Sequence, residues 1–396
     1  MNTPKPERIG DHVLSWASIL DENTREQALS LSTLPFIHPH IALMPDAHAG
    51  KGSAVGTVIP TRGAVIPAAV GVDVGCGMVA ARTRYIASDL DNISLEELRD
   101  NIERSIPLSP GNYNRKVTRE HTVARVTELE ELAERDGVDL SHSPKWREQL
   151  GSLGGGNHFI ELCLDETDTV WCFLHSGSRG VGNKIAQKHI KTAQKLCRMW
   201  HIPLADPDHA YLPEGTPEFR SYIRELHWAQ RFALLNRDEM MDRFVDQLAR
   251  MFGDDVSTVE LERVNTHHNY TEKVTIRGEK VWLTRKGAVN ADTGVPGLIP
   301  GSMGTRSYVT RGKGNASALL SAPHGAGRVM SRSKARKSFT AADLDARMAG
   351  IVYRPGEEWI DEIPDAYKDI DVVMDDAADL VDIVHELRQV LNVKGT

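Results

Sequence analysis

Short apolar runs separated by glycine, proline and charged residues recur along this chain, and most have the length of a β-strand. Residues 55–60, 64–70 and 78–85 each predict a buried strand. Further runs alternate apolar and polar positions on both sides of a short polar turn, which is typical of hairpins. The predicted hairpins pair residues 158–164 with 169–175 and residues 273–276 with 280–284.

Longer segments repeat apolar residues with the 3.6-residue period of amphipathic helices. Ser94 is followed by Glu97 in a capping-box pattern, and Thr216-Pro217 has the cap and first-turn proline of another helix. The predicted helices cover residues 94–106, 183–200, 216–252 and 370–390.

Residues from about 105 to 148 are polar and highly charged, and we expect a peripheral, partly helical and mobile excursion there. The chain has no internal repeat, no low-complexity linker and no convincing domain boundary. We therefore expect one domain over residues 1–396.

Composition narrows the class of protein. The 396 residues are 40% hydrophobic, which is enough for a large core. A net charge of −8 argues against a protein that coats nucleic acid through its overall charge. The sequence has no apolar run of 18 residues and no signal-peptide pattern at its start, so we expect a cytoplasmic protein without membrane contact. Its four scattered cysteines favour free thiols over disulfides.

Asp73 and Cys76 are the first candidates for chemistry. Glycines at 71, 75 and 77 surround them, so a carboxylate and a thiolate can turn toward one ion. This pair needs further ligands, and the best candidates are His158, His175 and His268. Each histidine taken alone could equally be a hydrogen-bonded structural residue. Five ligands exceed the needs of one open catalytic ion, so the set predicts two ions bridged by the thiolate. Zinc, manganese or iron would suit it, and ligand softness favours zinc.

Two glycine-rich loops, residues 300–305 and 323–328, resemble backbone cradles for phosphate. His324 stands at the start of the second loop, either as a hydrogen-bonding residue that shapes a turn or as a nucleophile or acid beside a bound phosphate. A basic run follows, and it is either a solvated face or a polyanion contact. Its members are Arg328, Arg332, Lys334, Arg336 and Lys337.

Several uncommon motifs occur along the chain in this order: MPDAHAGKG, VGVDVGCGM, GGGNHFIE, HSGSRG, HHNY, TRKGA, PGSMG, PHGAGRVMSR and AYKDID. Together they resemble the RtcB family of RNA-splicing and RNA-repair ligases. The resemblance covers nearly the whole chain except residues 105–148 and the extreme N-terminus. The resemblance implies an α+β fold in which mixed, mainly antiparallel β-sheets pack together in a single large domain surrounded by helices.

The resemblance also implies an activity and a site. Family members join an RNA 3′-phosphate or 2′,3′-cyclic phosphate to a 5′-hydroxyl, using GTP and two manganese ions, and some need an archease-like activator. Manganese therefore replaces zinc as the expected metal. Asp73, Cys76 and His158 would hold one ion, and Cys76, His175 and His268 the other.

Carried onto this sequence, the resemblance makes His324 the guanylylated nucleophile. It also makes Asp46 a supporting residue needed for activity, either behind the residues that bind the ligands or on the RNA side of the site. The expected GTP contacts are Asn157, Phe159, Glu161, Asn269, Pro300, Gly301, Ser302, Met303, Ser307, Gly325, Ala326, Gly327, Tyr367 and Lys394. Arg179, Arg328 and Arg332 are candidate RNA contacts.

Two other classes could use the same residues. A two-metal phosphoesterase or nuclease would use water as its only nucleophile on RNA ends. A non-catalytic RNA-binding protein would need the metals only to stay folded. The physiological RNA and the oligomeric state stay open.

Overall fold

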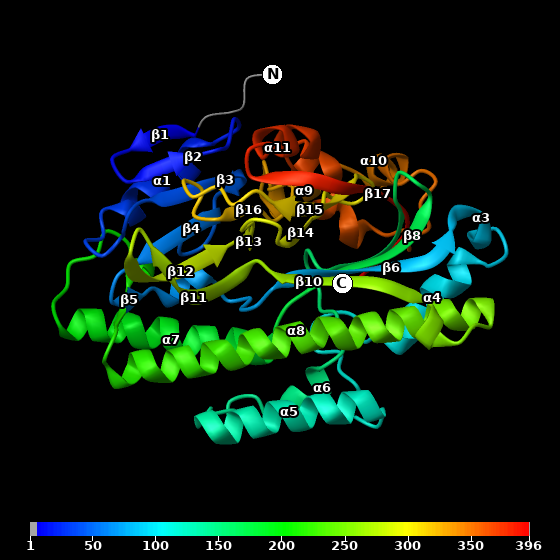
Figure 1. Cartoon of the computed structure of the whole chain (residues 1–396), viewed down its shortest axis with the longest axis horizontal. Coiled ribbons are helices and arrows are strands. Elements are labelled where there is room, and N and C mark those ends of the chain that lie inside the picture. Colours follow the sequence, from blue (N-terminus) through cyan, green and yellow to red (C-terminus); the bar gives the residue numbers. More distant parts are fainter. Residues whose placement is uncertain (1–5, 396) are drawn as a thin grey trace.

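The computed structural model describes residues 6–395, and its largest element is a seven-stranded antiparallel sheet (Figure 1). Chain order and spatial order differ, because hairpins and long crossovers interleave. The strands, in spatial order, are β10 (Glu260–His267), β6 (Gly77–Ile86), β8 (Thr169–Ser176), β7 (Phe159–Leu164), β17 (Val381–Lys394), β15 (Ser307–Gly312) and β14 (Pro296–Ile299).

A six-stranded sheet packs against the first through a shared apolar core that includes Met44, Val58, Met78 and Phe173. Its order is β1 (Glu7–Gly10), β2 (Val13–Ser15), β3 (Ile41–His48), β4 (Val55–Thr61), β12 (Glu279–Lys286) and β11 (Asn269–Ile276). Two small ladders pair β13 (Ala288–Asn290) with β16 (Ser321–Pro323) and β5 (Ala64–Val65) with β9 (Leu212–Pro213). Among the described strand pairs only β2 and β3 run parallel, so the expected α+β fold with mainly antiparallel sheets is confirmed.

Two long helices, α7 (Arg179–Met199) and α8 (Pro217–Phe252), lie against each other beneath the sheets in Figure 1. Thr216 caps α8 by accepting the Phe219 N–H, and Pro217 occupies the first turn, as the sequence predicts. The remaining helices are α1 (Glu22–Ser32), α2 (Pro67–Val70), α3 (Ala87–Leu90), α4 (Leu95–Ser105), α5 (Glu120–Asp136), α6 (Trp146–Gln149), α9 (Arg332–Ser338), α10 (Ala341–Arg347) and α11 (Ile370–Asp376), with 3-10 turns η1 (Pro207–His209), η2 (Val256–Thr258), η3 (Glu357–Glu362) and η4 (Pro364–Ala366).

The charged excursion is built mainly from α5 and α6, on the outer side of α8 (Figure 1). The ring of Trp146 meets Trp228 of α8 edge to face, and Trp228 donates its indole N–H to the Leu129 carbonyl. Arg125 of α5 pairs with Glu239 and with a second carboxylate on α8. Apolar and charged contacts therefore hold this segment to the helical layer, and its mobility stays a prediction.

The predicted helix over residues 370–390 is wrong beyond its first two turns. Helix α11 ends at Asp376, and residues 381–394 form β17 between β15 and β7. Leu387, Gln389, Leu391 and Val393 are buried, at every second position. That two-residue period is the strand signal, and the acidic residues upstream hid it.

The predicted strand over residues 64–70 is also too long. It ends at Val65, and α2 begins at Pro67, whose fixed φ and missing N–H suit the first position of a helix. None of the helices within residues 6–395 has the length and apolar character needed to cross a membrane.

Gly77 tests how tightly β6 and β10 are paired. A Cβ atom at this position would overlap the backbone carbonyl oxygen of Thr266 on β10, the residue before His267, with which Gly77 is paired. We expect Gly77→Ala to lower the free energy of unfolding by about 2 kcal/mol or more, because the strands must separate. Urea unfolding measures this change.

Gly180→Ala is the matched control, because the added methyl group meets no atom nearer than 3.4 Å. Equal stability of the two variants would contradict the tight pairing of β6 with β10.

Candidate functional site

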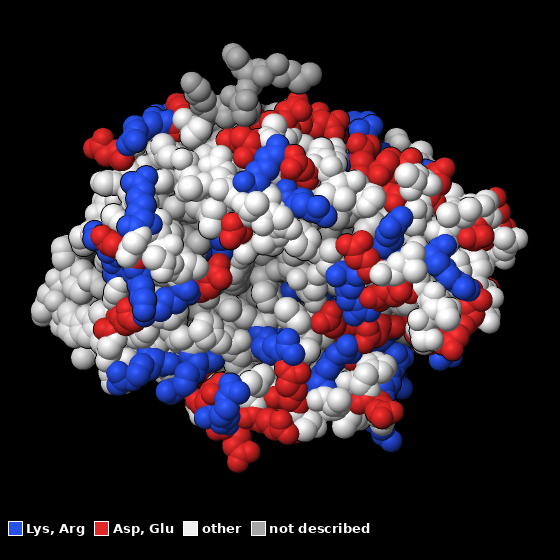
Figure 2. All heavy atoms as spheres, viewed as in Figure 1, with Lys and Arg blue, Asp and Glu red and all other residues white. Residues whose placement is uncertain are grey.

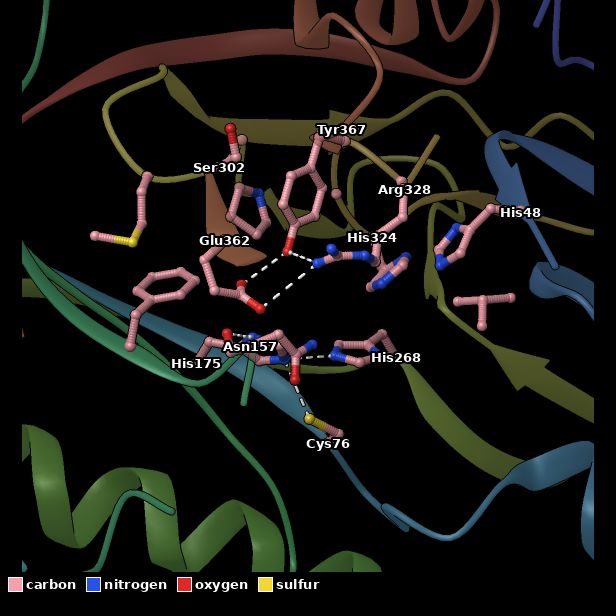
Figure 3. Close-up of a pocket in the computed structure, with 18 of the residues that line it drawn as sticks. His48, Cys76, Asn157, His175, His268, Ser302, His324, Arg328, Glu362 and Tyr367 are labelled. Atoms are coloured by element: carbon pink, nitrogen blue, oxygen red, sulfur yellow. Dashed lines mark hydrogen bonds and ion pairs between the residues drawn. The ribbon is translucent and has the colours of Figure 1, made fainter. Parts of the chain in front are cut away.

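A cavity of about 290 Å³ lies where the ends of the two sheets meet (Figure 3). The start of β6, the strands β7 and β8, the β10–β11 turn and both glycine-rich loops supply its walls. Most predicted site residues line it: Asp73, Cys76, Asn157, Phe159, Glu161, His175, His268, Asn269, Pro300, Gly301, Ser302, Met303, His324, Gly325, Ala326, Gly327, Arg328, Arg332, Tyr367 and Lys394.

Four predicted residues lie outside the cavity wall. His158 contacts Asp73 and Cys76 from behind, and Asp46 contacts His324 in the same way. Ser307 accepts the Gly301 N–H and so supports the first glycine-rich loop. Arg179 donates its Nε–H to Ser152 instead of lining the cavity.

Two groups of three side chains could each hold a metal ion, and they share Cys76. One group is Cys76, His175 and His268, and the other adds Asp73 and His158 to the same cysteine. Within each group the donor atoms lie within 4.8 Å of one another. The Cys76 Sγ atom is 3.1 Å from His175 Nε2 and 3.5 Å from His158 Nε2. A sulfur between two ligand groups is the geometry that a bridging thiolate requires.

The histidine tautomers fit metal binding. Nδ1 of His158 lies 2.9 Å from the Leu153 carbonyl oxygen, and Nδ1 of His175 lies 3.1 Å from that of Asn157. A carbonyl can only accept, so each Nδ1 carries a proton and each Nε2 is the atom that a metal would bind. Nε2 of His158 also lies 3.0 Å from Asp73 Oδ2 and donates a hydrogen bond to it, so a metal that binds there must replace that proton. His175 Nε2 faces His268 Nε2 at 2.9 Å, a contact between two acceptors unless a proton or a cation lies between them.

Burial and neighbouring charges set the protonation of these groups. Burial and the neighbouring imidazoles hold the pKa values of His175 and His268 well below the ordinary value, so both rings are neutral. Burial opposes the charge on Asp73, but its hydrogen bond with His158 outweighs this and lowers its pKa to about 2. Burial and the nearby Asp73 carboxylate raise the pKa of the Cys76 thiol, so binding of a metal must release that proton.

His324 is held by a buried carboxylate. Asp46 Oδ2 lies 2.6 Å from His324 Nδ1 and also accepts the backbone N–H groups of His324 and Gly325. Because Asp46 accepts from the ring, Nδ1 carries the proton and the Nε2 lone pair stays free. The His324 ring centroid lies 4.6 Å from that of His268, so the free nitrogen belongs to the same chamber as the candidate metal ligands (Figure 3).

The opposite wall joins carboxylates to cations. Glu362 accepts hydrogen bonds from the Tyr367 hydroxyl and Arg332, and Lys394 lies 3.4 Å away. Arg328 donates to the same tyrosine hydroxyl and lies over its ring (Figure 3). Burial opposes ionisation of Glu362, yet Lys394 and Arg332 keep its pKa below the ordinary value. Sequence patterns gave no sign of Glu362, because its cationic partners Arg332 and Lys394 lie 30 and 32 residues from it along the chain.

The predicted basic run is largely neutralised within the molecule. Arg332 and Arg336 both pair with Asp361, and Arg332 pairs with Glu362 as well. These two carboxylates belong to the six-residue turn η3, about 25 residues after the run. Any anion that binds Arg332 must therefore compete with fixed carboxylates.

Arg237 of α8 was also missed. It is fully buried, and its Nη1 donates to the carbonyl oxygens of Gly75 and Ser176 at 2.8 and 3.1 Å. Its Nη2 lies 3.1 Å from Nδ1 of His267. These three residues adjoin Cys76, His175 and His268 in sequence, so one guanidinium ties together all three segments of that ligand group. The signal in the sequence was an arginine on the apolar stripe of a helix.

The preceding residue, Asn236, fastens the neighbouring loops. Its Oδ1 accepts the N–H groups of Gly151 and Ser152, and its Nδ2 donates to Gly177 O at 3.1 Å. The middle of α8 is therefore a buried polar platform beneath the candidate metal centre.

The fold and the site together define a class of protein: an α+β protein whose pocket joins a candidate two-metal centre to two glycine-rich loops and a histidine with a free ring nitrogen. The chain belongs to the RtcB family, because the family model described as tRNA-splicing ligase RtcB matches residues 27–395.

Characterised relatives agree. The RNA-splicing ligase RtcB of Escherichia coli K12 is 46% identical over 392 residues, which cover 95% of each chain. RtcB1 of a second E. coli strain is equally similar. The tRNA-splicing ligase RtcB of Pyrobaculum aerophilum is 31% identical, over 94% of this chain and 90% of its own.

Replacing Arg237 should separate metal binding from folding. Lysine keeps the charge but cannot bridge three chain segments, so we expect Arg237→Lys to weaken binding of a metal ion by roughly 10- to 100-fold. Titration with Co²⁺, followed by the thiolate-to-cobalt absorption band, measures this affinity.

Arg243→Lys is the control. Arg243 is a second buried arginine of α8, and it bonds Ser105, Asn114 and Glu239 instead of the segments that carry the ligands. An equal loss of Co²⁺ affinity in both variants would mean that general loosening, and not Arg237, explains the effect.

Glu161 should make stability depend on pH. Burial raises its pKa to about 8 despite the nearby Lys394 and its hydrogen bond with Asn392. The native state therefore retains a proton that the unfolded chain loses near pH 4.5. The stabilisation is complete below that pH and is lost as the pH rises through about 8.

Glu161→Gln cannot ionise. We expect the free energy of unfolding of the variant, relative to that of the wild type, to rise by up to about 1.4 kcal/mol for each pH unit between pH 4.5 and about 8. Urea unfolding of both proteins across this pH range measures the difference. A difference independent of pH would contradict the raised pKa.

Proposed function

We propose that this RtcB-family RNA ligase joins RNA 3′-phosphate or 2′,3′-cyclic phosphate ends to 5′-hydroxyl ends with GTP, through a covalent histidine–GMP intermediate at His324. The observation that carries the proposal is the free Nε2 of His324, fixed by Asp46 and facing a chamber that contains two candidate metal groups. Family membership and the names of the relatives support the ligase activity.

Two manganese ions are the proposed cofactors. Asp73, Cys76 and His158 would hold one, and Cys76, His175 and His268 the other. Bound there, they would offset the negative charge of phosphate groups that otherwise repels a nucleophile. The Nδ1-protonated rings of His158 and His175 support this assignment, because their Nε2 atoms already face the shared sulfur.

His324 is the proposed nucleophile. Asp46 holds its ring in one tautomer, so Nε2 can attack the α-phosphorus of GTP while the proton stays on Nδ1. Pyrophosphate leaves, and the histidine carries GMP. Asp46 then stabilises the positive charge that the ring acquires on substitution, which is the role of the buried carboxylate in other His–Asp pairs.

The glycine-rich loops suit a nucleotide. Residues 300–303 and 325–327 line the chamber. The N–H groups of Gly301, Ser302 and Gly325 already donate to Ser307, Thr305 and Asp46, so a phosphate would use the remaining backbone N–H groups of these loops. We assign the base to the far wall, near Glu161, Tyr367 and Lys394. A carboxyl group with a pKa of about 8 can donate a hydrogen bond at neutral pH, which an ionised one cannot. Phe159, Asn157 and Asn269 complete the proposed GTP contacts.

RNA enters in the second step. The GMP passes from His324 to the RNA 3′-phosphate, and that end becomes activated. The 5′-hydroxyl oxygen then attacks the activated phosphorus, GMP leaves, and the strand is sealed. Arg328 lines the chamber beside Tyr367 and is a proposed phosphate contact. Arg332 is a second proposed contact, and it can bind a phosphate only after its ion pair with Glu362 breaks. A cytoplasmic location and an archease-like activator belong to the same proposal.

The test is incubation with α-labelled GTP and Mn²⁺, followed by denaturing electrophoresis. We expect a covalent label on the wild type and none on His324→Ala. Asp46→Asn should lower the rate of labelling by about 100-fold or more, because an amide can stabilise the wrong tautomer.

His201→Ala, which removes an exposed histidine outside the site, should label like the wild type. Hydrolysis of RNA ends without any protein-bound guanylate would instead support a two-metal phosphoesterase or nuclease. RNA binding with neither reaction, together with unfolding on metal removal, would support a non-catalytic role.

A further inference from the structure

Helix α7 carries a row of cations with no acidic residue between Arg179 and Met199. The row is Lys184, Lys188, Lys191, Lys195 and Arg198. These positions are separated by alternating steps of four and three residues, which places them on one face of a helix. That face lies opposite the buried stripe of Ile185, Ala186, His189 and Ala193. A protein of net charge −8 therefore displays one continuous basic ridge, about 20 Å long.

Most of the ridge has no partner within the molecule. Lys191, Lys195 and Arg198 are exposed and form no ion pair with any residue of the described part of the chain. Lys188 pairs with Asp139 and Glu225 at one end. By contrast, Arg231 of the neighbouring α8 pairs with Glu128 of α5. Positive charge on α8 is thus partly neutralised within the molecule. Most of the positive charge on α7 is not, so it is available to bind an anion from solution.

Aromatic surface continues the ridge. Trp200 directly follows α7 and is 43% exposed, and the adjacent Met199 is 60% exposed. The other six tryptophans are at most 6% exposed. An exposed indole beside unpaired cations is the combination that binds single-stranded nucleic acid, because phosphates meet the cations while a base stacks on the ring.

The ridge is also connected to the site. Helix α7 begins four residues after His175, the candidate ligand at the end of β8, and runs away from the chamber. Arg220 and Arg224 of α8 are exposed beside it. Figure 2 shows Lys and Arg gathered at the lower left of this face, where Figure 1 places the first turns of α8 in front of the last turns of α7. The central hollow of the surface lies above them.

We propose that the α7 ridge, defined as Lys184 to Arg198 with Trp200, binds the backbone of the RNA substrate at a distance from the join. This inference rests on the proposed function. It favours RNA over an acidic protein or an anionic membrane, because α7 begins four residues after His175, which lines the chamber in which an RNA phosphate would react. The exposed tryptophan adds a stacking surface, which phosphate-only binding to a membrane would not use.

The test compares wild type with the variant Lys191→Gln/Lys195→Gln/Arg198→Gln. The probes are a single-stranded 3′-phosphate RNA of about 20 nucleotides and one of about 4, chosen to span and to fall short of the ridge. We expect the variant to raise KM for joining the long RNA about tenfold or more and to leave the short RNA unchanged. The slope of log K against log salt for the long RNA should fall by about 2, since three contacts are lost.

Trp200 gives an independent signal. The long RNA should quench the exposed fraction of the tryptophan emission of the wild type, and Trp200→Phe should lose this quenching because the remaining tryptophans are buried. Trp200→Ala should weaken binding of the long RNA about fivefold or more.

The matched control is Arg135→Gln/Arg147→Gln/Arg250→Gln, which removes the same charge from exposed arginines that each pair with a nearby carboxylate. It should change neither KM nor the salt slope. All variants should be guanylylated like the wild type, because none of these residues lines the chamber.

An unchanged KM, salt slope and quenching in the ridge variants would overturn the proposal. The same holds if anionic vesicles bind the wild type and lose binding in the triple variant while RNA binding stays constant. A wild type that binds the long RNA through the ridge but forms no guanylate would overturn the proposed function and keep the ridge. The two failures are therefore distinguishable.

Discussion

The contact of the Cys76 sulfur with the imidazoles of His158 and His175 is the constraint on which the rest of the structure depends. Metal-competent side chains are packed here into a largely buried space, and His175 Nε2 faces His268 Nε2 at 2.9 Å, which requires a proton or a cation between them. Such packing costs free energy unless a proton or a cation is shared. The surrounding chain supplies the compensation. Backbone carbonyls fix two of the rings, and α8 inserts Arg237 and Asn236 beneath the three segments that must converge.

The sequence predicted the parts of this site whose residues lie close together along the chain or in one hairpin. Asp73 and Cys76 lie three residues apart in a glycine-rich loop, and the two hairpin strands place His158 and His175 at one end. The ordered motifs then implied the pairing of ligands that the side-chain geometry allows. Arg237 could not be predicted in this way, because it contacts Gly75 from 162 positions away and reads as one more residue of a long helix. Its role exists only once β6, β8, β10 and α8 are packed together.

The errors in the predicted fold have the same origin. The predicted helix over residues 370–390 included residues 381–390 because the whole stretch is acidic and amphipathic, yet β15 and β7 offer two open edges that a strand can join. Pairing on both sides satisfies the backbone and buries every second side chain, which outweighs a helical preference over the same residues. Pro67 shortened another predicted strand, and there the local signal was present in the sequence.

Charge was harder to predict than structure. The run from Arg328 to Lys337 is visible in the sequence because its acidic partners, Asp361 and Glu362, lie in a distant turn. The row of cations on α7 is not visible as a run, because its members are four and three residues apart. In the folded protein most cations of the run form ion pairs with carboxylates, whereas most cations of the row on α7 form none. The position of α7 links this difference to the metal centre. Strand β8 sets both the place of His175 and the direction in which α7 leaves the chamber, and α8, which packs on α7, carries Arg237. One pair of helices therefore both supports the candidate ligands and determines where positive charge reaches the surface.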